Sequence, residues 1–281
     1  MTFSINSGNS FSSRSIGGAQ KTQNEVFQRL SSMLRINSAS DDAAGSAIMQ
    51  RQTAQIRGAD QGIRNANDGI SFVQTAQGGL GEISSNLQRM RELAVQAANG
   101  TANSGDRSAM QAEINQLSSA NTDLSKSAFG GQSIFPSGGK NVSFQVGPDA
   151  GAGNQISVDL NSLEDLNSVS SDQGGNAIDV SSAESATAAI EQIDADIEAV
   201  SRQAGKFGAV ENRFNSAISN AEEFSINTQA ARSRIGDADV AKEVSRLIQA
   251  QILEKASIAS ATQANQSKKM VLSLLGGGIR T

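Results

Sequence analysis

The sequence predicts a mainly α-helical protein: an elongated antiparallel helical bundle or coiled coil with a small β-hairpin region, its N- and C-terminal segments packed together. Three observations support this fold class: few aromatic residues, long apolar runs at helical spacing, and matching runs in both halves of the chain. Only 4% of the 281 residues are aromatic, and Trp and Tyr are absent. A compact globule of this length usually fills its centre with aromatic side chains, so Ala, Ile, Leu and Val suit thin seams between helices better.

The longest helical pattern lies between residues 56 and 97. Its apolar residues follow one another at steps of three and four for about six heptads, which is typical of a coiled-coil seam. If helical throughout, the segment is roughly 60 Å long at about 1.5 Å per residue. The seam consists of Ile56, Ala59, Ile63, Ala66, Ile70, Val73, Ala76, Leu80, Ile83, Leu87, Met90, Ala94 and Ala97.

Three glycines, Gly78, Gly79 and Gly81, interrupt this pattern. Together they cost a helix roughly 3 kcal/mol relative to alanine. Burial of Leu80 and Ile83 returns roughly 1.5 to 3 kcal/mol apiece. The helix is therefore predicted to continue through the glycines, provided that its apolar stripe is packed.

Two further stripes supply the partners of this helix. One runs through the C-terminal half at steps of three, four or seven: Ala186, Ile190, Ile193, Ile197, Val200, Ala204, Phe207, Phe214, Ile218 and Ala221. A shorter one comprises Met110, Ile114, Leu117 and Leu124. Stripes of matching kind from both halves of the chain indicate a single antiparallel bundle.

The region from about 130 to 178 has a different character. Residues 141–146 and 155–160 alternate apolar and polar side chains at period two, and a segment rich in Gly, Pro, Asp and Asn separates them. This pattern predicts a β-hairpin, which we expect at the far end of the bundle.

Each end of the chain contains an Arg-Ile pair followed by acidic residues, and we interpret both as hinges. Acids at a helix start cap free N–H groups and complement the macrodipole, so a new helix is expected after each pair. The predicted hinge residues are Arg35, Ile36, Asp41, Asp42, Arg234, Ile235 and Asp237, with Asp239 as a further acid. The boundaries divide the chain into a terminal domain, residues 1–36 plus 236–281, and a helical rod, residues 37–235, that contains the hairpin region.

The terminal segments carry only narrow, short apolar stripes. Such helices are marginal alone and are expected to order against each other or against neighbouring copies. The residues expected to make these contacts are Val26, Leu30, Met33, Leu34, Val240, Val244, Leu247, Ile252, Leu272 and Leu275.

Composition excludes several classes of function. Without Cys and His, the chain has no disulfides, no Cys or His metal sites and no Ser-His-Asp triad. A net charge of -5 argues against nucleic-acid binding, and no apolar run approaches the roughly 20 residues of a membrane helix. The N-terminus lacks the pattern of a secretory signal peptide. We expect no cofactor and no enzymatic activity.

Several long motifs resemble the terminal regions of bacterial flagellin. They are "RLSSMLRINSASDDAAGSAI", "RNANDGISFVQTAQGGLGEISSNLQRMRELAVQAANGT", "GAVENRFNSAISN", "ARSRIGDADVAKEVSRLIQAQIL" and "QANQSKKMVLSLL". The match covers roughly residues 20–130 and 200–275 in the family's order. About 50 residues separate the rod helices, so the chain is similar to a minimal flagellin without variable outer domains. Met33 stands where the family commonly has Gly.

This resemblance implies a structural subunit that self-polymerises into an extracellular flagellar filament, its terminal helices ordering on assembly. It implies export through the flagellar type III system, and as partners the chain itself, an export chaperone, the filament cap and hook-filament junction proteins. A junction protein of the same superfamily is the nearer alternative function, and an enzyme is the more distant one.

On a helical wheel, Leu93 projects away from the seam beside polar neighbours. It is interpreted either as a scattered surface leucine or core edge, or as a filament contact. The resemblance favours the filament contact, because the same motif is also what Toll-like receptor 5 engages in many flagellins, and Gln88, Arg89, Leu93 and Glu113 stand at the matching positions. The acid pairs Asp41/Asp42 and Asp237/Asp239 fit helix caps better than a metal site.

Overall fold

The computed structural model describes residues 7–136, 138–160, 163, 166, 168–169 and 178–276, with side chains from residue 13 onward except those of residues 272 and 274–276. The chain divides into two compact units, residues 1–53 with 228–281 and residues 54–227. The long helices α2 (Ala43–Ala98) and α4 (Ala183–Gly236) contribute residues to both units. The division at residues 36 and 236 that the sequence suggests stays a prediction.

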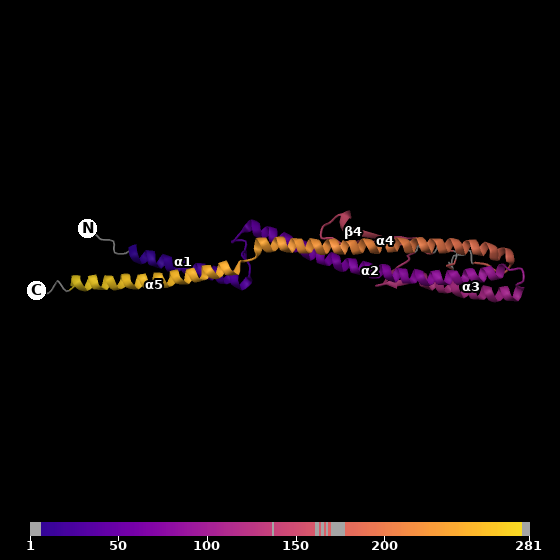
Figure 1. Ribbon diagram of the computed structural model, residues 1–281, viewed down its shortest axis with the longest axis horizontal. Coiled ribbons are helices and arrows are strands. Elements are labelled where there is room, and N and C mark those ends of the chain that lie inside the picture. Colours follow the sequence, from indigo (N-terminus) through magenta and orange to yellow (C-terminus); the bar gives the residue numbers. More distant parts are fainter. Residues whose placement is uncertain are drawn as a thin grey trace. The chain divides into compact units, whose positions relative to one another are not determined.

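In the unit formed by residues 54–227, α2 and α4 run antiparallel, and α3 (Ser104–Ser125) lies beside α2 (Figure 1). Three polar pairs mark how α2 and α4 match: Asp60 with Ser225, Gln74 with Glu211, and Arg91 with Asp194. From one pair to the next, the two residue numbers change by the same amount in opposite directions. The two helices therefore stay in step over about 30 residues, as a coiled-coil seam requires.

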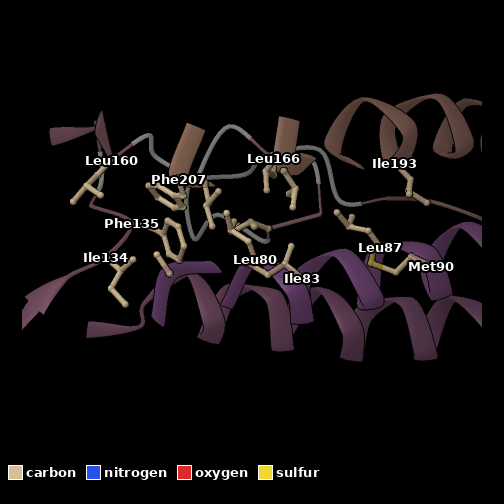
Figure 2. Packing of buried hydrophobic residues seen from close by; sticks show 14 of the residues in the cluster. Leu80, Ile83, Leu87, Met90, Ile134, Phe135, Leu160, Leu166, Ile193 and Phe207 are labelled. Atoms are coloured by element: carbon tan, nitrogen blue, oxygen red, sulfur yellow. The ribbon is translucent and has the colours of Figure 1, made fainter. Parts of the chain in front are cut away.

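The predicted seams form the core of this unit. Leu80, Ile83, Leu87 and Met90 are at most 1% exposed. Figure 2 shows these side chains in a row along α2, with Ile193 and Phe207 of α4 on the opposite side. The predicted continuation of α2 through its three glycines is confirmed. Because Leu80 and Ile83 are fully buried, packing offsets the poor helix propensity of the glycines.

A pair of amide side chains joins α2 to α3. Asn121 is fully buried, and its Oδ1 accepts a hydrogen bond of 2.8 Å from Nδ2 of Asn86. The Nδ2 of Asn121 lies 4.0 Å from the sulfur of Met90. The core between these helices is thus apolar except for one satisfied polar contact.

The predicted hairpin is confirmed: β3 (Lys140–Gln145) pairs antiparallel with β4 (Gln155–Leu160), and the turn η1 (Ala152–Asn154) precedes β4. A smaller hairpin joins β1 (Ala128–Phe129) to β2 (Gln132–Ser133). Gly130 and Gly131 form its two-residue loop with φ of 58° and 83°. Such positive φ values suit the twist of a tight hairpin and favour glycine.

The expected position of the larger hairpin at the far end of the bundle is wrong. The hairpin packs on the early part of α2 in this unit, where Asn65 Nδ2 donates to the carbonyl of Gln145 at 2.8 Å. Phe144 also contacts Phe214 of α4 edge-on, with ring centroids 5.5 Å apart. The segment that joins α3 to the hairpin lets β3 return along the bundle, away from the turn between α2 and α3. Period-two alternation predicts a strand but not where it docks.

In the other unit, α1 (Ser7–Ser32) lies side by side with α5 (Val240–Gly276) (Figure 1). Their seam is thin, with Ala19, Val26 and Ala250 as its buried apolar residues among those described. The predicted pairing of the two ends of the chain is confirmed. Among the described residues, no helix has the length and apolar character needed to cross a membrane.

Candidate assembly and hinge sites

The two segments predicted as hinges lie against each other. Leu34 and Asp237 form an antiparallel β-bridge. The Arg35 N–H donates to the carbonyl of Gly236 at 2.6 Å, and the Ala238 N–H donates to that of Met33 at 3.0 Å. The hinge therefore consists of two short extended segments joined through their backbones.

The helices that follow the hinge begin with matched caps. Oδ1 of Asp42 accepts from the N–H of Gly45 at 2.9 Å at the start of α2, and Oδ1 of Asp239 accepts from the N–H of Lys242 at 3.2 Å at the start of α5. Each aspartate bonds the third N–H of its helix, which is the usual N-cap contact. The predicted capping is correct for these two acids.

The other two acids of the predicted hinge do not cap a helix. Each of them bonds a residue that precedes it in the chain. Asp237 accepts from the hydroxyl of Ser233, near the end of α4. Oδ2 of Asp41 accepts from the N–H groups of Asn37 and Ser38 at 3.0 and 2.9 Å. These bonds, with that of Ser38 first, lower the pKa of Asp41 below its ordinary value. Asp41 thus closes the loop of the first hinge.

Arg35 and Ile36 hold the first hinge segment, and Gly236 the second. The Arg35 guanidinium donates to the carbonyl of Ile235, while the side chain of Ile36 is buried. Gly236 is buried against Met49, whose sulfur would lie 2.8 Å from a Cβ at this position. Arg234, the remaining predicted hinge residue, is exposed.

Met33 has a φ of 57°, which makes it the one non-glycine residue with positive φ in the described part of the chain. It directly follows α1, at the position where helices commonly end in the left-handed conformation. A β-carbon makes that conformation unfavourable, so glycine would be the less strained residue at this position. The side chain of Met33 is 57% exposed, so it is not buried in the seam with α5.

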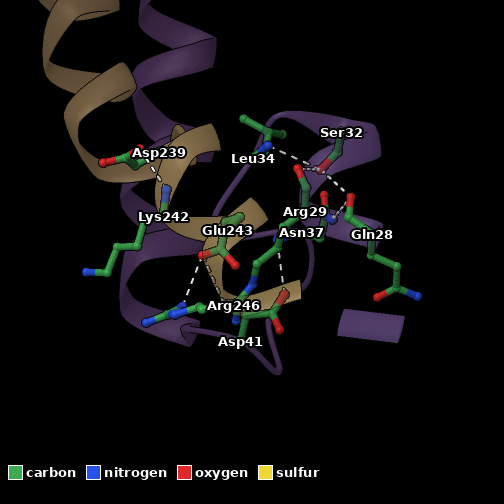
Figure 3. A network of polar contacts seen from close by, with 10 residues as sticks. All are labelled: Gln28, Arg29, Ser32, Leu34, Asn37, Asp41, Asp239, Lys242, Glu243 and Arg246. Atoms are coloured by element: carbon green, nitrogen blue, oxygen red, sulfur yellow. Dashed lines mark hydrogen bonds and ion pairs between the residues drawn. The ribbon is translucent and has the colours of Figure 1, made fainter. Parts of the chain in front are cut away.

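A buried carboxylate joins α1 to α5 beside the hinge (Figure 3). Glu243 is 4% exposed and forms ion pairs with Arg29 of α1 at 3.7 Å and with Arg246 at 3.0 Å. Further along, Glu254 accepts from Gln23 at 2.7 Å and from Gln20 at 3.2 Å, and these bonds lower its pKa. The two contacts fix which residues of the helices lie opposite one another.

The apolar residues of α5 lie on two faces. Leu247 is half-buried toward α1, whereas Val240, Val244, Ile248 and Ile252 are 39% to 60% exposed. These four residues repeat at steps of four, so they form one stripe along the helix. Leu253, Ile258, Met270 and Val271 extend the exposed apolar surface.

Sequence reasoning placed Val240, Val244, Leu247 and Ile252 on one stripe and missed Ile248. The steps of four from Val240 could have identified it. On α1, Val26 is buried and Leu30 is half-buried, as is Leu34 just beyond the helix. The side chains of Leu272 and Leu275 lie outside the described residues.

Leu93 is buried, which corrects the expectation that it projects away from the seam. It is 3% exposed and belongs to the main core. The shorter stripe of α3 explains the difference, because α3 covers a second face of α2 that the α2–α4 wheel leaves bare. Of the interpretations offered, the core edge fits this burial and the surface leucine does not.

Polar residues around Leu93 form an exposed network. Gln88 and Arg89 are exposed on α2. The guanidinium of Arg89 bonds Glu113 of α3 at 2.9 Å and Glu92 at 3.1 Å, and these contacts, Glu113 first, raise the pKa of Arg89. Arg89 thus links the two helices at the surface.

Among the described residues, no three acidic side chains gather in a group that could hold a metal ion. Asp42 and Asp239 use their side-chain oxygens on helix N–H groups. The glycine pair Gly130 and Gly131 forms the tight loop of the small hairpin.

Comparison with known proteins identifies the family. Residues 3–141 match the bacterial flagellin N-terminal helical region, and residues 190–275 match the bacterial flagellin C-terminal helical region. A flagellin of Halalkalibacterium halodurans is 42% identical over 252 residues, covering 89% of this chain and 91% of the relative. A flagellin of Bacillus subtilis is 39% identical, with the same coverage of both chains.

A solved structure agrees with this match. The crystal structure of Bacillus cereus flagellin has a TM-score of 0.50 and 27% identity, covering 56% of this chain and 88% of that one. Helical regions of the family match at both ends of the chain and in the family's order. The chain belongs to the bacterial flagellin family.

Proposed function

We propose that the chain is a structural, non-enzymatic subunit that polymerises with copies of itself into the filament of the bacterial flagellum. One observation carries the proposal: eight of the fifteen large hydrophobic side chains exposed among the described residues lie on α5. A soluble monomer rarely exposes such a concentration of apolar surface without a use. Neighbouring copies of α5 and α1 are the partners that this surface fits.

The terminal pair is proposed to become ordered fully only on assembly. Its seam buries few apolar residues, whereas ordering costs about 1 to 2 kcal/mol per residue in backbone entropy alone. A neighbouring copy that covers the Val240–Ile252 stripe supplies the missing burial. A chain with loosely held ends also suits export through a narrow flagellar type III channel.

Hydrogen exchange on the monomer tests this ordering. Residues 1–30 and 245–281 are expected to be unprotected, while residues 56–97 are protected by the main core. In polymer, the ends gain protection. Equal protection of ends and core in the monomer would contradict folding on assembly.

Electron microscopy tests polymerisation. After seeding or salting out, the intact chain is expected to form long tubes, and a chain lacking residues 245–281 is expected to form none. A sharper test replaces Val244 and Ile252 with lysine, which places two charges on the exposed stripe. The matched control puts the same charges on the same helix at Ser245 and Gln251, which are exposed and polar.

The control variant is expected to polymerise and the stripe variant is not, while helical circular dichroism of both monomers stays unchanged. Tubes from both variants would contradict a role of the stripe in assembly. If the intact chain stays monomeric under every condition, a hook-filament junction protein becomes the better assignment.

The hinge is proposed to separate two functional domains. Residues 1–36 with 236–281 would form the inner core of the filament, and residues 37–235 the outer rod. The support is local: Arg35 bonds the carbonyls of Ile235 and Gly236, and Leu34 forms a β-bridge with Asp237. New helices begin at capped positions directly after these segments.

The Arg89 surface, comprising Gln88, Arg89 and Glu113, is proposed as a contact for Toll-like receptor 5 and for adjacent subunits. Leu93 would act from beneath, as core packing that holds α2 against α3. Arg89→Ala is expected to lower signalling in receptor-expressing cells, and Arg202→Ala, an exposed arginine on α4, serves as control. Unchanged signalling by Arg89→Ala would remove the receptor role.

An export chaperone, the filament cap and hook-filament junction proteins are proposed as further partners. Each must recognise a chain whose terminal helices carry exposed apolar residues before assembly. Location outside the cell, in the filament, follows from the same proposal.

A further inference from the structure

The turn between α2 and α3 contains Asn99–Gly100, the one Asn-Gly dipeptide in the sequence. We propose that Asn99 is a modification site, at which the chain's own backbone converts the side-chain amide into a carboxylate without any enzyme. The inference is independent of filament formation. It rests on the geometry of this turn and on the chemistry of the asparagine amide.

The reacting groups are accessible. Asn99 and Gly100 are both exposed, and a β-carbon at Gly100 would meet no atom within 4 Å. Glycine offers no side chain to hinder approach of its nitrogen to the neighbouring amide. Solvent can also reach the turn, as the later hydrolysis requires.

The turn also polarises the amide. The N–H of Thr101 donates to Oδ1 of Asn99 at 3.3 Å. A donor at this oxygen stabilises the negative charge that develops there when a nucleophile adds to the side-chain carbonyl. The bond holds the amide carbonyl over the backbone that follows it.

The reaction has two balanced steps. The Gly100 nitrogen, losing its proton to solvent base, adds to Cγ of Asn99, and the C–N bond of the amide breaks to release ammonia and leave a five-membered succinimide. Water then adds to either carbonyl of the ring. One opening yields aspartate, and the other yields isoaspartate, in which the backbone runs through the side-chain carbon.

Asn103 in the same turn provides an internal comparison. Its Oδ1 accepts from the N–H of Asp106 at 2.9 Å as the N-cap of α3, and its own N–H donates to that aspartate at 3.2 Å. The side chain is therefore directed toward the helix, and Ser104 follows it with a β-carbon. The structure favours reaction at Asn99 over Asn103.

The product has a structural consequence. Arg107 donates to the backbone carbonyls of Ala97 at 2.9 Å and Asn99 at 3.2 Å, so its positive charge lies close to the modified residue. In the aspartate form this arginine balances the added charge. In the isoaspartate form the extra backbone carbon displaces the Asn99 carbonyl, which also accepts from the N–H of Ala102 at 3.1 Å.

The test is mass spectrometry of the intact chain after incubation in mildly alkaline buffer at constant temperature. Trypsin cleavage after Arg91 and Arg107 gives one peptide, residues 92–107, that contains both asparagines. Fragmentation then locates the mass increase of a single deamidation. Isoaspartyl methylation measures the isoaspartate fraction independently.

Asn99 is expected to react roughly tenfold faster than Asn103, equivalent to about 1.4 kcal/mol in activation free energy. Gly100→Ala, which the open space accommodates, should slow Asn99 by a similar factor. Thr101→Ala retains the backbone donor and should leave the rate unchanged. Equal rates at the two asparagines, or no effect of Gly100→Ala on a folded chain, would overturn the proposal.

Discussion

Two glycines of α2 predict opposite outcomes for the same substitution. At Gly62, a β-carbon would lie 2.4 Å from the carbonyl oxygen of Val146 and 2.7 Å from its carbon. At Gly78, it would meet nothing within 4 Å. Gly62→Ala therefore pushes the hairpin away from α2, while Gly78→Ala changes only the helix itself.

The expected change in the free energy of unfolding is the gain in helix propensity minus the cost of overpacking. Alanine gains about 1 kcal/mol in helix propensity over glycine at either position. Gly62→Ala additionally incurs the overpacking penalty of about 1 to 3 kcal/mol, because the obstructing atoms are backbone and cannot rotate aside. The gain in helix propensity is the same for both variants, so the free energies of unfolding of Gly78→Ala and Gly62→Ala should differ by the overpacking penalty alone. Gly78→Ala itself should be about 1 kcal/mol more stable than the parent.

Urea unfolding followed by far-ultraviolet circular dichroism measures the difference, since a chain without Trp or Tyr offers no useful fluorescence. Both variants should retain the parent slope with denaturant, which shows that the unfolded surface is unchanged. Equal stabilisation by the two substitutions would refute close docking of the hairpin on α2.

Three further predictions concern the hinge and the core. Met33→Gly should stabilise the end of α1 by roughly 1 kcal/mol in urea unfolding, because it relieves the positive φ of a residue with a β-carbon; lower stability would contradict this. The carboxyl of Asp41 has a lowered pKa in the folded chain, so its loop bonds stabilise the fold fully above pH 3.8, the ordinary pKa of aspartate. This stabilisation is lost as the pH falls through the lower pKa of the folded chain. An NMR titration should show the loop signals of Ser38 changing only below pH 3.8, and a transition above that value would disprove the loop bonds. Leu93→Ala should destabilise the chain by about 2 to 5 kcal/mol as a cavity mutation, so unchanged thermal stability would show that the side chain is not buried.

The sequence predicts the long helices well because their signal is repeated many times. Thirteen apolar positions between Ile56 and Ala97 agree on one face, and no local irregularity outweighs them. Even three glycines leave α2 intact, since Leu80 and Ile83 are buried in the core. The same repetition identified the stripes of α3 and α4.

The sequence pattern of two helices does not predict features that depend on contacts with a third helix or with a hairpin. A wheel drawn for two helices leaves Leu93 outside, because it does not include α3. The docking position of the β3–β4 hairpin depends on how far the preceding segment travels, which alternation does not encode. Glu243 gave no signal as a buried charge, since its partners Arg29 and Arg246 include one more than 200 residues away.

At the hinge, the residue types predicted the function of half the acids. Asp42 and Asp239 occupy N-cap positions three residues before the N–H groups that they bond, which is a local and readable spacing. Asp41 and Asp237 are the same residue type, but their side chains accept hydrogen bonds from residues that precede them in the chain. Only the three-dimensional path of the chain distinguishes the two cases.

The buried amide of Asn121 fixes the register of α3 along α2. Apolar side chains that recur every turn tolerate a slip of one turn, about 5.4 Å, with little change in the surface that they cover. Asn121 does not, because a slipped helix would separate it from Asn86 and strand a buried amide, at about 1 to 3 kcal/mol. A single polar contact thus disfavours packing registers of α3 on α2 that the apolar contacts alone would allow.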